Sequence, residues 1–124
     1  MVKALVIDDS ENMRNEMETI LKELKCEVEQ AEDGMVALEK VTTNKNYDML
    51  IVDYHMPNLN GLGFVQEVKK LELEKQPKIF FVTTEIQAEL KKKAKELGVN
   101  AWIIKPYDKA MITKFLTKAI ANIA

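Results

Sequence analysis

The stretch ALVIDDS, residues 4–10, is a short apolar run that ends in two adjacent carboxylates, Asp8 and Asp9, and a serine. A brief run rich in Val, Ile and Leu is typical of a β-strand that is buried on both faces. Three later runs also end on a polar residue: LIVD at 50–53, FFVT at 80–83 and WIIK at 102–105. The repeated pattern predicts an α/β fold with a parallel sheet, because the strands of such sheets are apolar throughout.

The polar residues at these four strand ends point to one shared site. The carboxyl ends of neighbouring parallel strands meet at one edge of the sheet, where open α/β sheets bind their ligands. We therefore expect one pocket to hold three carboxylates, a hydroxyl and an ammonium, those of Asp8, Asp9, Asp53, Thr83 and Lys105.

Helical patterns separate the apolar runs along the whole chain. Strands are expected at 4–7, 27–31, 50–52, 79–82 and 101–104, with the second the weakest and therefore an edge strand. Apolar residues recur with helical spacing over about 11–24, 35–43, 64–71, 86–97 and 111–123. Because parallel strands need crossover connections, this alternation predicts a parallel sheet with helices on both sides.

The charged residues around the fourth helical pattern are expected to form a solvated face. The members of this group are Lys91, Lys92, Lys93 and Lys95 together with Glu85, Glu89 and Glu96. A mixture of both signs on one helix is typical of an exposed surface. The net charge of −2 argues against a nucleic-acid-binding surface, which needs clustered basic residues.

Length and composition fit a single globular domain over residues 1–124. The chain is 47% apolar and 31% charged, an ordinary balance for such a domain. No apolar run is long enough to span a bilayer and the start has no signal region, so we expect a cytoplasmic protein without membrane insertion. The single cysteine, Cys26, is expected to be a reduced, partly buried thiol, because it has no partner for an internal disulfide.

The predicted pocket suits phosphoryl chemistry. Three carboxylates close together repel one another, and a bound cation would offset their charge. With oxygen ligands only, the expected cation is Mg²⁺, which keeps several waters and leaves room for a phosphoryl oxygen. A carboxylate can act as the nucleophile in phosphoryl transfer and form an aspartyl phosphate. Asp53 is the candidate nucleophile because its strand is expected at the centre, with Lys105 and Thr83 as donors to phosphoryl oxygens.

Each motif also has a structural interpretation when it is taken alone. Asp9 or Ser10 could be the N-cap of the helix that follows. Asp53 could be a turn residue, and Lys105 could lie in an ordinary loop. Their matching positions at four successive strand ends favour the shared site.

Two other classes of phosphate-binding protein fit the sequence less well. Metal-dependent phosphatases with an Asp nucleophile carry a motif similar to Asp-x-Asp-x-Thr after their first strand, whereas this chain has DDSEN at 8–12. A nucleotide or flavin binder needs a glycine-rich phosphate loop. Here Gly61 and Gly63 are followed by Gln66 in place of a third glycine, and no P-loop lysine motif is present.

Taken together, the motifs resemble the receiver domain of two-component response regulators, and the resemblance covers essentially the whole chain. It rests on VIDDS at 6–10, Asp53 with Met56-Pro57 and Gly61, VTT at 82–84 and IKP at 104–106. With Met13-Arg14 after DDS, the chain is most similar to the stand-alone receivers of chemotaxis. The resemblance implies a flavodoxin-like (βα)5 three-layer sandwich with sheet order 2-1-3-4-5. It also implies a phosphoacceptor that is not an enzyme but promotes its own phosphorylation and dephosphorylation.

The resemblance implies a role for each acidic residue of the site. Asp53 would accept a phosphoryl group from a histidine kinase. Mg²⁺ would be bound by the side chains of Asp9 and Asp53 and by the backbone carbonyl of His55, with Asp8 acting mainly through a water.

The resemblance also implies a switch. Thr83 would move toward the phosphoryl group, and Trp102 would take the place of the switch aromatic and rotate between exposed and buried positions. The active state would change the face made by the fourth helix, the fifth strand and the fifth helix. The Lys105-Pro106 peptide bond would be cis.

The partners implied by the resemblance are a sensor histidine kinase of the chemotaxis type, the flagellar motor switch protein or another phospho-dependent partner, and a phosphatase. A monomer is expected. Two alternatives stay open: a phosphorelay intermediate that passes its phosphoryl group to a histidine phosphotransfer protein, and a receiver fragment of a longer regulator.

Three residues depart from the usual receiver pattern. His55 occupies the variable position two residues after the acceptor, where its side chain is expected to be free to meet a water or a partner. Thr84 is larger than the residue often found after Thr83, which would narrow access to the phosphoryl group. Trp102 replaces a Tyr or Phe, and its larger indole would resist full burial.

Overall fold

The apolar runs form one five-stranded parallel sheet in the computed structural model, which describes residues 1–123. The order β2-β1-β3-β4-β5 confirms the predicted order, with the second strand at one edge. The last residue of the expected domain, Ala124, lies outside the described residues. The strands are β1 (Lys3–Ile7), β2 (Glu27–Ala31), β3 (Met49–Val52), β4 (Lys78–Thr83) and β5 (Ala101–Ile104).

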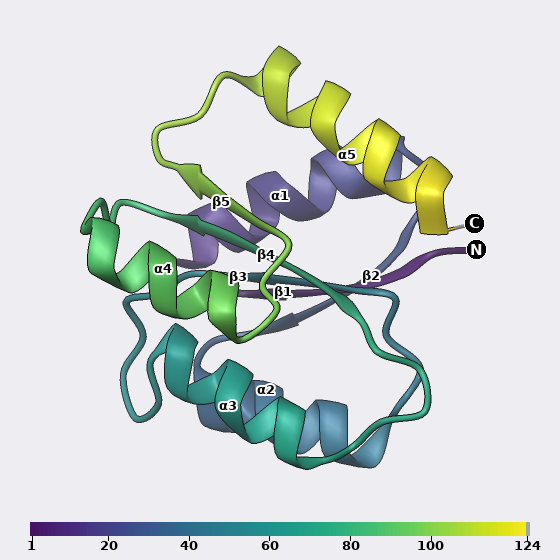
Figure 1. The fold of residues 1–124 in the computed structure, drawn as a ribbon. Coiled ribbons are helices and arrows are strands. Elements are labelled where there is room, and N and C mark those ends of the chain that lie inside the picture. The colour runs from purple at the N-terminus through teal and green to yellow at the C-terminus, as the bar shows by residue number, and fades with distance from the viewer. Residues whose placement is uncertain (124) are drawn as a thin grey trace.

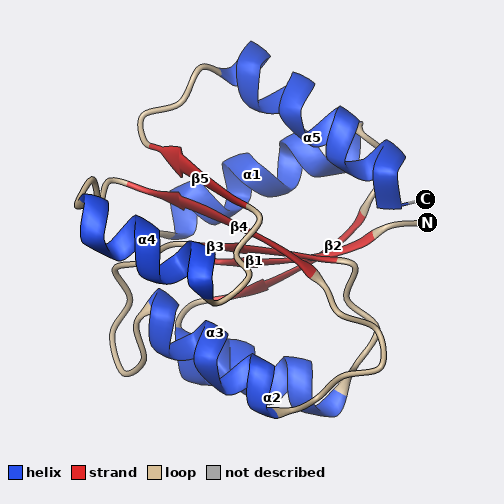
Figure 2. Ribbon diagram, in the orientation of Figure 1, coloured by secondary structure: helices blue, strands red, loops and turns tan. Residues whose placement is uncertain are grey.

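Helices cover both faces of this sheet, so the fold is the expected three-layer sandwich (Figure 1; Figure 2). The helices are α1 (Glu11–Glu23), α2 (Gly34–Thr43), α3 (Gly61–Lys70), α4 (Ala88–Glu96) and α5 (Lys109–Ile123). Helices α1 and α5 lie on one face, and α2, α3 and α4 lie on the other. None of the helices in residues 1–123 is long and apolar enough to cross a membrane.

The central strands are apolar on both faces because each face has its own core. In β1, Leu5 and Ile7 belong to the core under α2, α3 and α4, whereas Ala4 and Val6 belong to the core under α1 and α5. In β4, Phe81 and Phe80 divide between the two cores in the same way. Successive side chains of a strand point to opposite faces, so an uninterrupted apolar run is what two cores require.

Polar side chains set the beginnings of several helices. Ser10 accepts a hydrogen bond from the Met13 N–H at the start of α1, and Asn60 accepts one from Gly63 at the start of α3. The α3 helix therefore begins at Gly61, three residues before the first apolar residue that marked it in the sequence. The expected range 64–71 placed this helix too late and ended it one residue after Lys70.

Two expectations for the fourth helix are wrong. The helix begins at Ala88, so Ile86 lies before it and is 69% exposed rather than part of the buried stripe. Glu85 is buried rather than solvated, and its carboxylate accepts hydrogen bonds from the N–H groups of Ile86 and Gln87. The expectation holds for the lysines, since all four expected on this face are exposed.

The single cysteine fits its expected structural role. Cys26 is a free thiol that is buried just before β2, where it packs in the core under α1 and α5. Burial, with a smaller effect from the charge of Asp48, raises the pKa of this thiol above its ordinary value. A buried thiol with a raised pKa is a poor nucleophile.

Candidate functional site

The four polar strand ends meet at the carboxyl edge of the sheet. Strand pairing places Ile7 beside Val52 and Val52 beside Phe81, so Asp8 and Asp53 leave adjacent strands side by side. The last residue of β4, Thr83, pairs with Ile104 of β5, directly before Lys105. The sheet register therefore brings together the strand-end residues that the sequence predicted.

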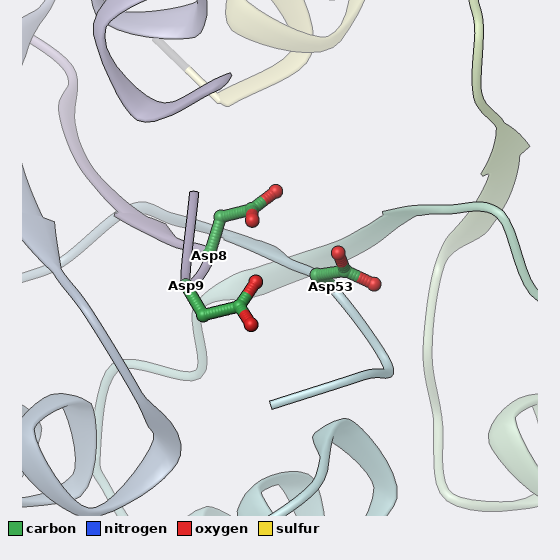
Figure 3. A group of neighbouring side chains, drawn as sticks. All are labelled: Asp8, Asp9 and Asp53. Atoms are coloured by element: carbon green, nitrogen blue, oxygen red, sulfur yellow. The ribbon is translucent and has the colours of Figure 1, made fainter. Parts of the chain in front are cut away.

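Three carboxylates form the acidic part of the site. Oxygen atoms of Asp8, Asp9 and Asp53 all lie within 4.8 Å of one another, and Figure 3 shows the three side chains grouped at the ends of β1 and β3. Asp8 and Asp53 are buried, whereas Asp9 is exposed. The site is thus open on the side of Asp9.

Backbone groups hold the two buried carboxylates in place. The N–H of Ser10 donates to Asp8 Oδ1 at 3.0 Å, and the N–H of His55 donates to Asp53 Oδ1 at 3.1 Å. The backbone of both residues extends the sheet, since Asp8 N–H donates to Ala31 and Asp53 N–H donates to Ile7. The Oδ2 oxygen of each carboxylate accepts a hydrogen bond from Lys105.

Lys105 is the positive charge of the site. Its Nζ lies 2.7 Å from Asp8 Oδ2 and 3.0 Å from Asp53 Oδ2, so one ammonium bridges two carboxylates that follow different strands. Burial lowers the pKa of Lys105, but the hydrogen bonds and charges of the two carboxylates outweigh it and the pKa is raised. Burial raises the pKa of Asp8, and the contact with Lys105 opposes that shift. The Lys105-Pro106 peptide bond is cis, as predicted.

Thr83 and Trp102 are joined through the backbone of Glu85. Thr83 is fully buried, and its Oγ1 accepts a hydrogen bond of 3.2 Å from the Glu85 N–H. The indole Nε1–H of Trp102 donates to the Glu85 carbonyl at 2.9 Å, and the ring packs against Phe81 with centroids 5.1 Å apart. The indole is therefore turned inward, yet Trp102 remains only partly buried.

The side chain of His55 is not free as expected. Its Nε2 lies 3.0 Å from Glu85 Oε1, so it links the loop after β3 to the loop after β4. The imidazole is 55% exposed, while the Glu85 side chain is only 10% exposed. Glu85 was not predicted as a site residue, because the mixed charges around the fourth helical pattern indicated a solvated face. Its position two residues after the strand-end Thr83 is the signal that could have identified it.

The donor set of the cluster fits a hard divalent cation. Three carboxylates with oxygens within 4.8 Å outnumber the one ammonium that neutralises them. Mg²⁺ is bound in proteins by one or two carboxylates and several waters, and the exposed side at Asp9 leaves space for such waters. The cluster of Asp8, Asp9 and Asp53 could therefore hold a metal ion.

Gly61 lets the start of α3 pass close to the loop after β3, and replacing it tests how tightly that loop is packed. A Cβ on Gly61 would lie 2.9 Å from the Asp53 carbonyl oxygen and 2.9 Å from Tyr54 Cα. Both are backbone atoms that cannot move aside, so we expect Gly61→Ala to destabilise the fold by about 1–3 kcal/mol despite its better helix propensity. The measurement is urea unfolding followed by Trp102 fluorescence.

Gly63→Ala is the matched control in the same helical turn. Its Cβ would meet the flexible end of the Leu59 side chain at 2.9 Å and no backbone atom at short distance. We expect a markedly smaller loss than at Gly61. An equal loss in both variants would contradict the close backbone contact at Gly61.

Comparison with known proteins gives a consistent picture. The sequence profile of the response regulator receiver domain matches residues 4–117. The chain is 38% identical over 107 residues to the chemotaxis protein CheY1 of Helicobacter pylori, covering 86% of each chain. It is 34% identical over 122 residues to a CheY homolog of Campylobacter jejuni, covering 98% of this chain and 94% of that protein. The structure of the chemotaxis protein CheY4 of Vibrio cholerae superposes with a TM-score of 0.85 at 34% identity, covering 95% of this chain and 98% of the other.

Proposed function

The chain belongs to the response regulator receiver domain family and is of the CheY type, and from this premise we propose that Asp53 accepts a phosphoryl group from a sensor histidine kinase of the chemotaxis type. The observation that carries the proposal is the Lys105 ammonium, which contacts both Asp8 and Asp53 inside the acidic pocket. A phosphoacceptor needs this combination, because the carboxylate must attack phosphorus while a cation neutralises the phosphoryl oxygens.

The proposed reaction is a direct transfer to the side chain of Asp53. A carboxylate oxygen of Asp53 forms a bond to phosphorus as the bond from phosphorus to one imidazole nitrogen of the kinase breaks. The other ring nitrogen carries a proton, so the leaving group is a neutral histidine and the product is an aspartyl phosphate. We assign Mg²⁺ binding to the side chains of Asp9 and Asp53 and to the His55 carbonyl, with Asp8 acting through a water. When bound, the ion neutralises charge on the phosphoryl oxygens. Lys105 supplies a second positive charge, because it already lies 3.0 Å from Asp53 Oδ2.

We propose that Thr83 and Trp102 pass the signal outward. If the Thr83 hydroxyl turns to donate to a phosphoryl oxygen, it gives up its contact with the Glu85 N–H. The Glu85 carbonyl, which accepts from the Trp102 indole, belongs to the same residue. A shift at Thr83 therefore acts on Trp102 through two hydrogen bonds, and it biases the face made by α4, β5 and α5.

The proposed output partner is the flagellar motor switch protein. The support for this choice is that the similar proteins from Helicobacter and Campylobacter are named chemotaxis proteins. We place the protein in the cytoplasm as a monomer that promotes its own phosphorylation and dephosphorylation, with a phosphatase as a further partner.

Partner binding tests this function directly. The chain is incubated with Mg²⁺ and acetyl phosphate and then mixed with the purified motor switch protein, with untreated chain as the control. We expect capture only after treatment, since phosphorylation shifts the population of the binding face. Capture of a histidine phosphotransfer protein instead would contradict the motor assignment and favour a phosphorelay intermediate.

A further inference from the structure

Arg14 reaches from the first turns of α1 back to the acidic cluster. Its Nη1 donates to the backbone carbonyl oxygen of Asp8 at 2.7 Å, and its Nε donates to Gln30 Oε1 at 2.9 Å. The residue is partly buried, and its own N–H continues the helix by donating to the Ser10 carbonyl. One planar guanidinium thus ties the loop after β1 to strand β2.

The partner of this guanidinium is itself fixed. Gln30 lies on β2, and its Nε2 donates to Asn15 Oδ1 and to Glu18 Oε1, each at 3.0 Å. Both acceptors belong to α1. The guanidinium is therefore held at one end by a small amide network and is directed at the Asp8 carbonyl at the other.

The Asp8 carbonyl matters because it controls the direction of Asp9. A peptide group is planar, so a hydrogen bond that orients the Asp8 carbonyl also orients the nitrogen and Cα of Asp9. The buried carboxylate of Asp8 has its own partners in Ser10 and Lys105. Within residues 1–123, by contrast, the exposed Asp9 carboxylate makes no hydrogen bond, and its backbone is what aims it at the cluster.

We propose that Arg14 is a positioning residue for the acidic cluster, which aims Asp9 at the cation site by holding the Asp8-Asp9 peptide in place. This role rests on the proposed function, since it supposes that the cluster binds a divalent cation. Loss of positioning and loss of charge change the cation affinity in opposite directions, so a measurement of affinity distinguishes them. A guanidinium near the site repels a cation, so removal of its charge alone would tighten cation binding.

The test measures Mg²⁺ binding by titration calorimetry on the full chain and on two variants. Arg14→Met removes the fork and the charge, and Arg14→Lys keeps the charge but cannot reproduce the planar fork. We expect Mg²⁺ affinity to fall by about tenfold in both, the lower end of the loss seen when partners of metal ligands are removed. Lys114→Met is the matched control, because it removes an exposed cation from α5 that takes no part in the contacts of Arg14, Gln30 or Glu18.

A second readout separates positioning from general damage to the fold. Phosphorylation by acetyl phosphate should be slow in the Arg14 variants at low Mg²⁺ and should approach the wild-type rate when Mg²⁺ is raised. Urea unfolding identifies a variant that fails to fold, in which case the other variant decides. Wild-type or tighter Mg²⁺ binding in a folded Arg14 variant would overturn the role of Arg14 alone. Failure of the wild type to bind Mg²⁺ would overturn the proposed function together with this role.

Discussion

Asp53→Asn should abolish phosphorylation by acetyl phosphate in the presence of Mg²⁺, whereas the wild type should gain one phosphoryl group. The amide has nearly the same shape as the carboxylate but is a far weaker nucleophile, so the loss should be complete on the time scale of the wild-type reaction. Intact-mass spectrometry measures the gain directly. The variant should still fold, because Asn can accept the hydrogen bond that the His55 N–H donates to Asp53.

Asp108→Asn is the matched control for this substitution. Asp108 is exposed at the start of α5 and accepts hydrogen bonds from the N–H groups of Ala110 and Met111. Asn is an equally good N-cap, so this variant should be phosphorylated like the wild type. Labelling of Asp53→Asn at the wild-type rate would show that another residue is the acceptor.

Lys105→Ala has the second largest expected effect. Bound Mg²⁺ would still neutralise the phosphoryl oxygens, so phosphorylation should remain possible, but it should no longer be coupled to signalling. Without the ammonium no fixed charge at the end of β5 holds the phosphoryl group in place, so the Thr83 hydroxyl should not turn toward it and Trp102 should no longer respond. We expect acetyl phosphate to change the Trp102 fluorescence of the wild type but not of this variant, while Mg²⁺ binding persists. Phosphorylated variant should also fail to capture the partner.

The same substitution should cost stability. Two buried carboxylates lose the cation that lies 2.7 Å and 3.0 Å away, and removal of one member of a buried ion pair costs about 3 kcal/mol. Urea unfolding without Mg²⁺ measures this loss, and added Mg²⁺ should reduce it by restoring positive charge. Lys109→Ala, which removes an exposed lysine at the start of α5, is the control. Normal partner binding by phosphorylated Lys105→Ala would contradict the switching role of the ammonium.

The sequence predicted the sheet because its signals were local and repeated. Each central strand is an apolar run, and each run ends on the polar residue that the structure places at the site, as at Asp8, Asp53 and Thr83. Strand order followed from the family resemblance, and the structure confirms it. The proximity of Asp8, Asp9, Asp53 and Lys105 could therefore be predicted before any contact was known.

Helix starts were harder to predict because polar caps, not apolar spacing, determine them. Asn60 caps the start of α3 and Asp108 caps the start of α5, both ahead of the apolar residues that marked these helices in the sequence. Contacts between loops were not predictable at all. The pair of His55 and Glu85 joins residues that are remote in sequence, and the guanidinium of Arg14 meets a backbone carbonyl that no sequence pattern marks.

The contacts of Glu85 divide into two kinds, and this division affects how the protein can change over evolution. Thr83 and Trp102 bind only the backbone N–H and carbonyl of this residue, which every amino acid except proline provides. His55 binds its carboxylate, which few amino acids can replace. Substitutions of Glu85 can therefore alter the contact with His55 while the backbone linkage between Thr83 and the Trp102 indole is kept.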